Sequence, residues 1–349
     1  MVPGVILLGF MIFMPESPRW LARKDRWEEC HKILTLIHGK GDPDSPLVQF
    51  EMNEIKEACA LEAQLADVTY WELFYPKNIY RTHIGMFTQI WSQLTGMNCM
   101  MYYITYIFGM AGYSGNANLL ASSIQYIINV AMTVPALIWM DRWGRRWPLI
   151  VGAFLMMSFM FANAGLMGGT GEVVPNGVDG VKQQSMKVSG APAKGLIACT
   201  YLFVASYAIT WGPISWVYPP EVYPLRVRGK AVALATSANW AFNTALAAFV
   251  PTAFETIRYK VYIIFGVFNL AMLLHVVFLF PETAGKTLEE VQLIFEDPNG
   301  LPYIGTPAWK THKSTKGMAE VEKGNVLPKG VDEKSIDEPA GTVEVKHDV

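Results

Sequence analysis

Amide side chains gather at helical spacing in a single apolar stretch of the chain. At 100° per residue, Gln89, Ser92 and Gln93 share one face with Gly96, whereas Asn98 lies opposite on an ideal helix. We expect the helix to unwind at Gly96, which would let Asn98 join that face. Each amide offers two donors and two acceptor lone pairs, which match the adjacent hydroxyls of an uncharged polyol. The alternative for any one amide is an interhelical hydrogen bond that only holds helices together.

Polar and aromatic side chains in later apolar stretches extend this pattern. Asn239 and Asn243 lie four residues apart and so share a helix face. Trp216 follows Gly212 and Pro213, and an indole can cover the apolar face of a sugar ring while its N–H donates a hydrogen bond. A proline in mid-membrane also frees backbone groups, which a neighbour or a water-lined cavity must satisfy. The alternative for Trp216 is an interfacial anchor, because it lies near a predicted helix end.

Two short links between apolar stretches carry charges of both signs. The first contains Asp141, Arg145 and Arg146, and the second contains Glu221 and Arg228. Such pairs can hold helix ends together in one state and release them in another, as in a rigid-body gate. Anchoring by the positive-inside rule explains the arginines but leaves the two acids unexplained.

The elements that must position these groups are long apolar helices. Six windows of 20–25 residues contain no Asp, Glu, Lys or Arg, although 17% of the chain is charged. Each window is long enough to cross a hydrocarbon core of ~30 Å as a helix. A soluble globular protein is therefore excluded, and we expect an all-α membrane protein. The windows are residues 84–108, 119–140, 148–168, 195–218, 231–254 and 261–280.

Other classes of function find no support in the sequence. The net charge of −2 favours no nucleic-acid partner, because phosphate binding needs a basic face. The four cysteines have no metal-ligand spacing, and no nucleophile motif or phosphate-binding glycine loop is present. We therefore expect no enzyme, no metal site and no cofactor.

The distribution of basic residues predicts the orientation of the spans. If residues 15–82 are cytosolic, 23 of the 28 Lys and Arg residues fall on that side of the membrane. We read 15–82 as cytosolic linker helices, with helical pieces near 26–38 and 48–66, and 83–281 as the transmembrane helices. Residues 1–14 are apolar but too short to span unaided, and we expect them to be the end of a longer membrane helix.

The remaining links and the C-terminal region are polar. Residues 169–194 are rich in Gly, Val and Pro, and we expect them to be loosely ordered at best. We read 282–349 as a cytosolic tail, with one helical stretch at 286–296 and a disordered remainder, because the tail has too little apolar content to fold.

Five sequence blocks, taken in order, resemble those of the sugar porter family of the major facilitator superfamily. Any one block is weak, but five in this order and spacing are specific, and they cover the chain from residue 15 to about residue 296. The similarity is to fungal high-affinity hexose carriers. It implies the C-terminal six-helix half of a twelve-helix carrier, with the N-terminal half absent. The blocks are PESPRWL at 15–21, QLTGMN at 93–98 followed by YY at 102–103, DRWGRR at 141–146, PPEVYPLRVRG at 219–229, and PET at 281–283 with KTLEE at 286–290.

The resemblance also implies roles for individual residues. The family's sugar ligands fall on Gln93, Asn98, Asn129, Trp216 and Asn239, with Trp240 and Asn243 as weaker candidates. The polar helix face around Gly96 adds Gln89 and Ser92 as candidates. The gate residues are Tyr102, Tyr103, Gly212 and Pro213, and the cytosolic charge network is Glu16, Arg19, Asp141, Arg145, Arg146, Glu221 and Arg228. The family commonly has a Gln pair where this chain has Ser92 and Gln93, which leaves room for a water or a bulkier ring.

We expect the function to be transport of a hexose such as glucose across the plasma membrane by alternating access, as proton symport. The spans contain no acidic residue, so a proton-carrying carboxylate would lie in the missing half, which the complete carrier requires as a partner. Two alternatives remain. One is a sugar-sensing receptor on a carrier fold, which would lose its output without residues 297–349. The other is an inactive truncated carrier.

Overall fold

The computed structural model describes residues 14–286 except 40, 44 and 65–67, together with residues 7, 9–11, 291, 294 and 295. Most of the predicted membrane-helix end at 1–14, most of the helical stretch at 286–296 and the whole tail 297–349 lie outside the described residues. The chain divides into two compact units, Met1–Thr69 and Tyr70–Val349.

The first unit is a group of short helices around a small apolar core. Its helices are α2 (Pro18–Arg23), α3 (Trp27–Ile37) and α4 (Pro46–Gln64), which agree with the helical pieces predicted near 26–38 and 48–66. The buried side chains of Leu21, Leu34 and Ile55 come from all three helices. Each helix is amphipathic because only one face contributes to this core.

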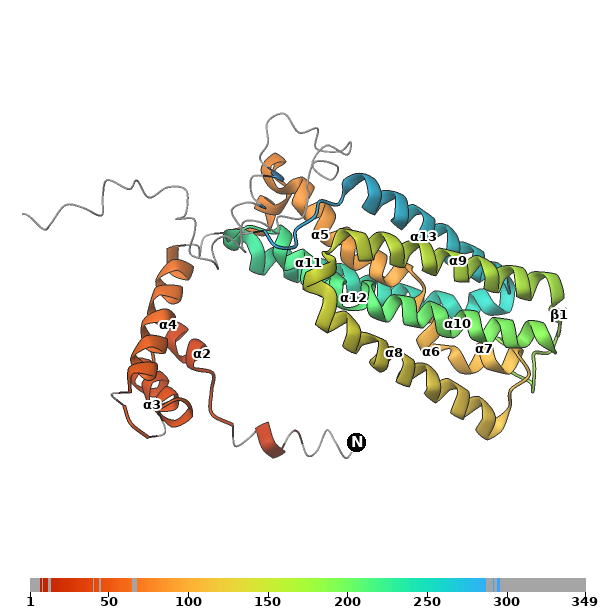
Figure 1. The fold of residues 1–349 in the computed structure, drawn as a ribbon, viewed down its shortest axis with the longest axis horizontal. Coiled ribbons are helices and arrows are strands. Elements are labelled where there is room, and N and C mark those ends of the chain that lie inside the picture. Colours follow the sequence, from red (N-terminus) through yellow and green to blue (C-terminus); the bar gives the residue numbers. More distant parts are fainter. Residues whose placement is uncertain are drawn as a thin grey trace, which may run out of the picture. The chain divides into compact units, whose positions relative to one another are not determined.

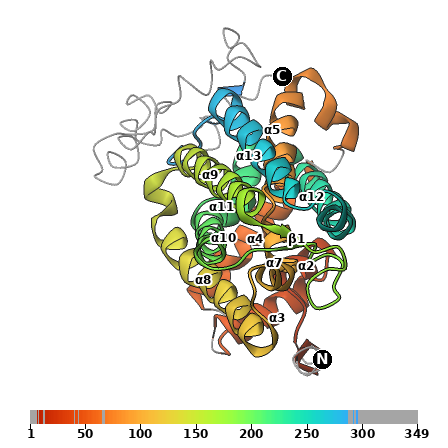
Figure 2. The same cartoon turned by 90° about the vertical axis from the view of Figure 1, so that its right-hand side faces the viewer.

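The second unit is a helical bundle with one short hairpin at its end (Figure 1). Helix α9 packs against α10 and α13, and α12 packs against α5. Figure 2 looks along the bundle and shows the long helices nearly end-on. The elements are η1 (Tyr70–Phe74), α5 (Pro76–Leu94), α6 (Met97–Tyr102), α7 (Ile104–Met110), α8 (Gly115–Trp143), α9 (Arg146–Thr170), β1 (Glu172–Val173), β2 (Met186–Lys187), α10 (Ala191–Ile209), α11 (Trp211–Val222), α12 (Leu225–Thr256) and α13 (Lys260–Leu279).

Four stretches of helix in the described part of the chain are long and apolar enough to cross a membrane: α8, α9, α10 with α11, and α13. The other two charge-free windows, 84–108 and 231–254, fall in α5–α7 and in α12. The window 84–108 is divided among three helices, of which α6 and α7 are each too short to cross a membrane. Helix α5 begins at Pro76, so it starts before the predicted boundary at residue 83.

The predicted break at Gly96 is confirmed. Helix α5 ends at Leu94, α6 begins at Met97, and Gly96 between them has φ +88°. Only glycine adopts this left-handed conformation without a steric penalty. A Cβ atom at Gly96 would also lie 2.8 Å from Cγ of Phe265 and 2.9 Å from Cε of Met160. The break therefore depends on glycine for two separate reasons.

Two further breaks divide the apolar windows. Tyr103 has non-helical dihedrals (φ −111°, ψ 21°) and separates α6 from α7. Thr210 (φ −122°, ψ −82°) separates α10 from α11, and the next residue, Trp211, is fully buried and donates its indole N–H to the carbonyl of Leu149 at 3.0 Å. Pro213 lies in the first turn of α11, where a proline costs no helical hydrogen bond.

The prediction that residues 169–194 are loosely ordered is wrong. Strands β1 and β2 pair antiparallel there, and the side chains of Met186 and Val188 are buried in the main core. The segment is tied to the bundle by hydrogen bonds from Val188 N to the Met110 carbonyl at 2.8 Å and from Ser185 Oγ to the Phe254 carbonyl at 2.6 Å. Figure 2 shows this segment crossing the near end of the bundle. These tertiary contacts supply the order that the local composition does not.

The break at Gly96 can be tested by its effect on stability. We expect Gly96→Ala to lower the free energy of unfolding by about 2 kcal/mol, since alanine must adopt a left-handed backbone conformation and displace Phe265 or Met160. The measurement is thermal or denaturant unfolding of the chain in detergent. Gly229→Ala is the matched control, because Gly229 lies within α12 with nothing within 4 Å of its Cβ position. Equal stability of the two variants would contradict the prediction.

Candidate functional site

Five amide side chains form one connected hydrogen-bond network at the Gly96 break. Gln89 donates to the Ser215 carbonyl at 2.8 Å, and Asn239 donates to Oε1 of Gln89 at 2.7 Å. Gln93 donates to Oδ1 of Asn239 at 3.0 Å. Asn98 and Asn243 both donate to Oε1 of Gln93, with a distance of 3.1 Å for Asn243. We call these five residues (Gln89, Gln93, Asn98, Asn239 and Asn243) the amide cluster.

The amide cluster joins helices that are far apart in the sequence. Gln89 and Gln93 come from α5, Asn98 from α6, and Asn239 and Asn243 from α12, while the terminal acceptor belongs to α11. Because every donor points the same way along the chain of bonds, the amides polarise one another. The expectation that unwinding at Gly96 brings Asn98 to Gln93 is confirmed by the hydrogen bond between them.

Burial within the amide cluster is graded. Gln89, Gln93 and Asn239 expose 2%, 8% and 3% of their surface, whereas Asn98 and Asn243 are half-buried. Within the described residues, none of the buried amide atoms of the cluster lacks a hydrogen-bond partner. Asn98 and Asn243 therefore form the accessible edge of a network whose interior is fully paired. An uncharged ligand with several hydroxyls can reach that edge and exchange hydrogen bonds with it.

Ser92 lies beside the amide cluster but bonds elsewhere. Its hydroxyl and that of Tyr207 from α10 are 2.8 Å apart. The prediction that the short Ser92 side chain leaves room for a water or a bulkier ring stays a prediction. Sequence reasoning did not single out Tyr207, because nothing in its local pattern distinguishes it from a core tyrosine.

Three candidate ligands are not joined to the amide cluster by a hydrogen bond in the described part of the chain. Asn129 on α8 is half-buried, and its side chain has no hydrogen bond there. Trp216 and Trp240 expose 51% and 59% of their surface. Trp216 directly follows Ser215, whose carbonyl ends the chain of amide bonds. The assignment of these three residues as ligands stays a prediction.

All four predicted gate residues lie at helix breaks. Tyr102 ends α6 and is exposed, and Tyr103 donates its hydroxyl to the Ala247 carbonyl of α12 at 2.8 Å. Gly212 and Pro213 follow the Thr210 break in the first turn of α11. A helix break permits one half of a helix to move relative to the other, which a continuous helix resists.

A cluster of charges is built around Arg145, where α9 begins and α11 ends, at the end of the second unit opposite the hairpin. Its guanidinium donates to both carboxylate oxygens of Glu221, with a shortest distance of 2.9 Å, and to Asp141 at 3.0 Å. The side chain of Arg145 is 8% exposed, against 26% for Glu221 and 81% for Asp141, so Glu221 is the dominant partner. Burial lowers the pKa of Arg145, but the hydrogen bonds and charges of Glu221 and Asp141 more than offset this effect and raise it.

Glu282 is a functional candidate that sequence reasoning missed. Its buried carboxylate accepts hydrogen bonds from the backbone N–H groups of Arg145 at 2.8 Å and Arg146 at 3.1 Å. It thereby caps the N-terminus of α9, where a negative charge is stabilised by the helix dipole. A Cβ atom at Gly144 would lie 2.6 Å from Glu282 Oε2. The PET block contained Glu282, but only the fold shows that it reaches the start of α9.

The other members of the predicted charge network have different partners. Arg146 donates to the Val277 carbonyl of α13 at 2.8 Å. Arg228 donates to the Tyr223 carbonyl at 3.1 and 3.2 Å, and it forms no ion pair with the described residues. Glu16 and Arg19 belong to the first compact unit, so their place in this network stays a prediction.

Comparison with known proteins identifies the family. The profile of the family described as "Sugar (and other) transporter" matches residues 1–295. The high-affinity glucose transporter of Kluyveromyces lactis is 45% identical over 332 residues, which cover 94% of this chain and 59% of that protein. High-affinity glucose transporter 1 of Candida albicans is 49% identical over 312 residues, which cover 89% of this chain and 56% of that protein.

Solved structures show the same fold. The major facilitator superfamily proton:xylose symporter XylE, bound to 6-bromo-6-deoxy-D-glucose, superposes with a TM-score of 0.60 and 26% identity, covering 84% of this chain and 57% of that one. An inward-open structure of the xylose transporter XylE from E. coli gives a TM-score of 0.63. The chain therefore spans little more than half the length of the relatives it matches. It belongs to the sugar (and other) transporter family of the major facilitator superfamily, and it is an integral multi-pass membrane protein rather than an enzyme.

Proposed function

We propose that this chain forms one half of a carrier that moves a hexose, glucose in the first place, across the plasma membrane by alternating access. The single observation that carries the proposal is the amide cluster, an uncharged hydrogen-bonding site between helices of a membrane protein. The two fungal relatives named above are high-affinity glucose transporters, which supports the choice of hexose. The chain's share of its relatives' length supports a need for a second six-helix half that supplies the opposite wall of the site.

The amide cluster is suited to reversible binding of a polyol. Its amides already satisfy one another, so the site has no buried, unpaired group when it is empty. A hexose replaces amide–amide hydrogen bonds with amide–hydroxyl bonds at a small net change in free energy, which permits both loading and release. Asn98 and Asn243 are the amides that the sugar meets first, because they lie at the accessible edge.

The surrounding residues extend this proposal. The exposed indole of Trp216, one residue beyond the Ser215 carbonyl, covers an apolar face of the sugar ring. The hydroxyls of Ser92 and Tyr207 give the site a small polar wall where relatives commonly carry a second Gln, and this wall influences which hexose is preferred. Asn129 and Trp240 contact the sugar only after helix movement, since no hydrogen bond joins them to the amide cluster within the described residues.

Alternating access requires elements that hold one state and then release it. The breaks at Gly96, Tyr103 and Thr210 let parts of the helices move, with Tyr102 and Tyr103 closing the site on the non-cytosolic side. The Arg145–Glu221 ion pair joins the start of α9 to the end of α11 and latches the cytosolic side. Glu282 holds the start of α9 in the orientation that this ion pair needs.

Proton symport is the finer form of the proposal. XylE, a structural relative, is a proton:xylose symporter. Among the described residues of the second unit, the buried or half-buried acids are Glu72, Glu221 and Glu282. Glu72 is paired with Arg226, and the other two are engaged in the charge cluster around Arg145. A proton-carrying carboxylate therefore belongs to the second half of the carrier.

The role of the amide cluster is tested by sugar uptake. With the chain joined to the N-terminal half of the Kluyveromyces lactis relative in a hexose-uptake-deficient yeast, we expect Gln93→Ala to lower labelled glucose uptake at least tenfold at low sugar concentration. The substitution removes the acceptor of Asn98 and Asn243 and the donor to Asn239, and roughly 1–2 kcal/mol per lost bond to an uncharged partner accounts for that effect.

Asn163→Ala is the matched control, because Asn163 is a fully buried amide outside the cluster. Among the described residues its side chain forms one hydrogen bond, to Thr200, which is long at 3.4 Å. Uptake that survives Gln93→Ala unchanged, at surface levels equal to the control, would refute the binding role.

Removal of residues 297–349 is expected to leave uptake intact, whereas a sensor would lose its output.

The cytosolic latch is tested by a double-mutant cycle on stability. We expect Arg145→Ala to lower the free energy of unfolding by about 3 kcal/mol, because it leaves the partly buried Glu221 without its cation. Combining it with Glu221→Gln should recover at least about 1 kcal/mol relative to the sum of the single effects. The same cycle on Arg226 and Glu72, whose arginine is 56% exposed, should give a coupling below about 1 kcal/mol. Strict additivity at Arg145 and Glu221 would exclude a latch.

A further inference from the structure

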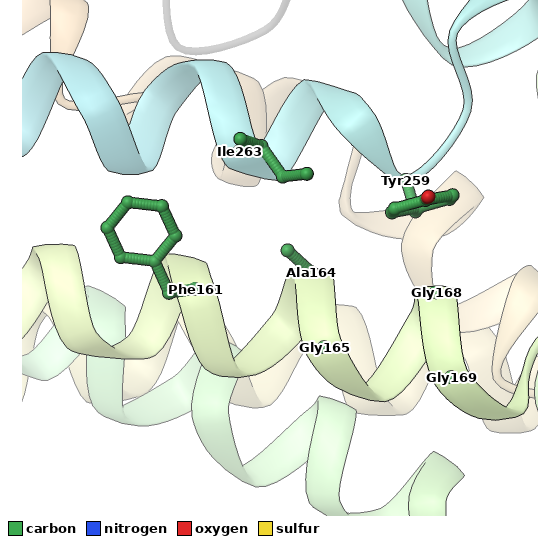
Figure 3. A pocket seen from close by; sticks show the side chains of 7 residues that line it. All are labelled: Phe161, Ala164, Gly165, Gly168, Gly169, Tyr259 and Ile263. Atoms are coloured by element: carbon green, nitrogen blue, oxygen red, sulfur yellow. The ribbon is translucent and has the colours of Figure 1, made fainter.

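An open groove lies between α9 and α13, away from the amide cluster and the charge cluster. It has a volume of about 470 Å³ and is lined by Phe161, Ala164, Gly165, Gly168, Gly169, Tyr259 and Ile263. Figure 3 shows Phe161 and Ala164 directed from α9 toward the α13 side, where Ile263 and Tyr259 face them. Neither α9 nor α13 contributes a residue to the amide cluster, so the groove belongs to a different surface of the bundle.

The groove is an apolar trough with a glycine floor. A Cβ atom at Gly165 or Gly169 would meet nothing within 4 Å, whereas one at Gly168 would lie 2.8 Å from the Tyr259 ring. The ring of Tyr259 therefore bounds one end of the trough. The lining is apolar apart from the Tyr259 hydroxyl, which suits a hydrocarbon chain.

Two cations are the chain neighbours of Tyr259, whose ring bounds the groove. Arg258 and Lys260 are the direct neighbours of Tyr259, in a tight turn closed by hydrogen bonds from Lys260 N to the Ile257 carbonyl and from Val261 N to the Arg258 carbonyl. Arg258 holds a left-handed backbone conformation (φ +55°), and its buried Nε has no hydrogen-bond partner among the described residues. The exposed Glu255 offsets only one of the two positive charges.

The groove opens toward the membrane leaflet opposite the charge cluster. Gly169 lies at the C-terminal end of α9 and Tyr259 at the N-terminal end of α13, whereas Arg145 and Glu282 lie at the other ends of these helices. With the charge cluster on the cytosolic side, as the distribution of basic residues predicts, we expect the turn at 257–260 to lie at the head groups of the other leaflet. At that depth, a cation beside an apolar trough matches a molecule with an anionic head and an aliphatic tail.

We propose that this groove is a binding site for one glycerophospholipid of the non-cytosolic leaflet. One acyl chain lies over Gly165 and Gly169 between Phe161 and Ile263. The phosphodiester accepts hydrogen bonds from the guanidinium of Arg258 and the ammonium of Lys260. The site is independent of the proposed transport function and uses none of its residues.

Photolabelling of the 349-residue chain in phosphatidylcholine vesicles tests this site. The vesicles contain a trace of phosphatidylcholine with a diazirine on its acyl chain, and the labelled peptides are mapped by mass spectrometry. We expect the label to concentrate on residues 161–169 and 259–263. Gly165→Leu with Gly169→Leu fills the trough without a clash and should lower that labelling about tenfold. Val134→Leu, on the exposed surface of α8, is the matched control and should leave labelling of the groove unchanged.

A second arm tests the head-group contact. Arg258→Gln with Lys260→Gln should reduce labelling by the phospholipid but not labelling by a diazirine fatty alcohol, which has no phosphate. Equal labelling of all exposed helix faces, or labelling that the filled variant retains at full strength, would overturn the proposal. So would oxidation of a Gly165→Cys variant to a disulfide-linked dimer through this cysteine, because a second copy of the chain would then occupy the trough.

Discussion

The constraint on which the second unit depends is that an amide inside a membrane protein must find a hydrogen-bond partner. Water is scarce there, and each unpaired group costs several kcal/mol. The amide cluster meets this constraint internally, because Gln93 accepts from Asn98 and Asn243 while it donates to Asn239. The same polar groups that would destabilise a continuous apolar helix are thereby made compatible with the bilayer and remain accessible at one edge.

This pairing has a geometric requirement, which explains the broken helices. On an ideal helix Asn98 would point away from Gln93, and the left-handed turn at Gly96 redirects it. Two other breaks divide charge-free windows in the same way: Tyr103 separates α6 from α7, and Thr210 separates α10 from α11. Charges join helix ends where α9 begins and α11 and α13 end, through Arg145, Glu221 and Glu282. Packed segments with mobile breaks and a charged latch are the components that a rigid-body change of access needs.

Much of this arrangement could be predicted from the sequence, and the failures have a common cause. The charge-free windows, the helices of the first unit and the break at Gly96 follow from local composition and periodicity. The prediction that residues 169–194 are loosely ordered is wrong because the order of this segment comes from distant partners such as Met110 and Phe254. The cap that Glu282 provides for α9 and the contact of Tyr207 with Ser92 are likewise long-range. The residue type also does not predict that Arg228 donates to the Tyr223 carbonyl instead of pairing with an acid.

The central claim is that the amide cluster exchanges its internal hydrogen bonds for those of a hexose. The most direct measurement is a structure of the chain, assembled with a second carrier half, with glucose bound. The account predicts sugar hydroxyls within hydrogen-bonding distance of at least two amides of the cluster, with the bonds from Asn98 and Asn243 to Gln93 broken or lengthened. Glucose bound elsewhere while these bonds stay intact, or amides that face the acyl chains, would contradict it.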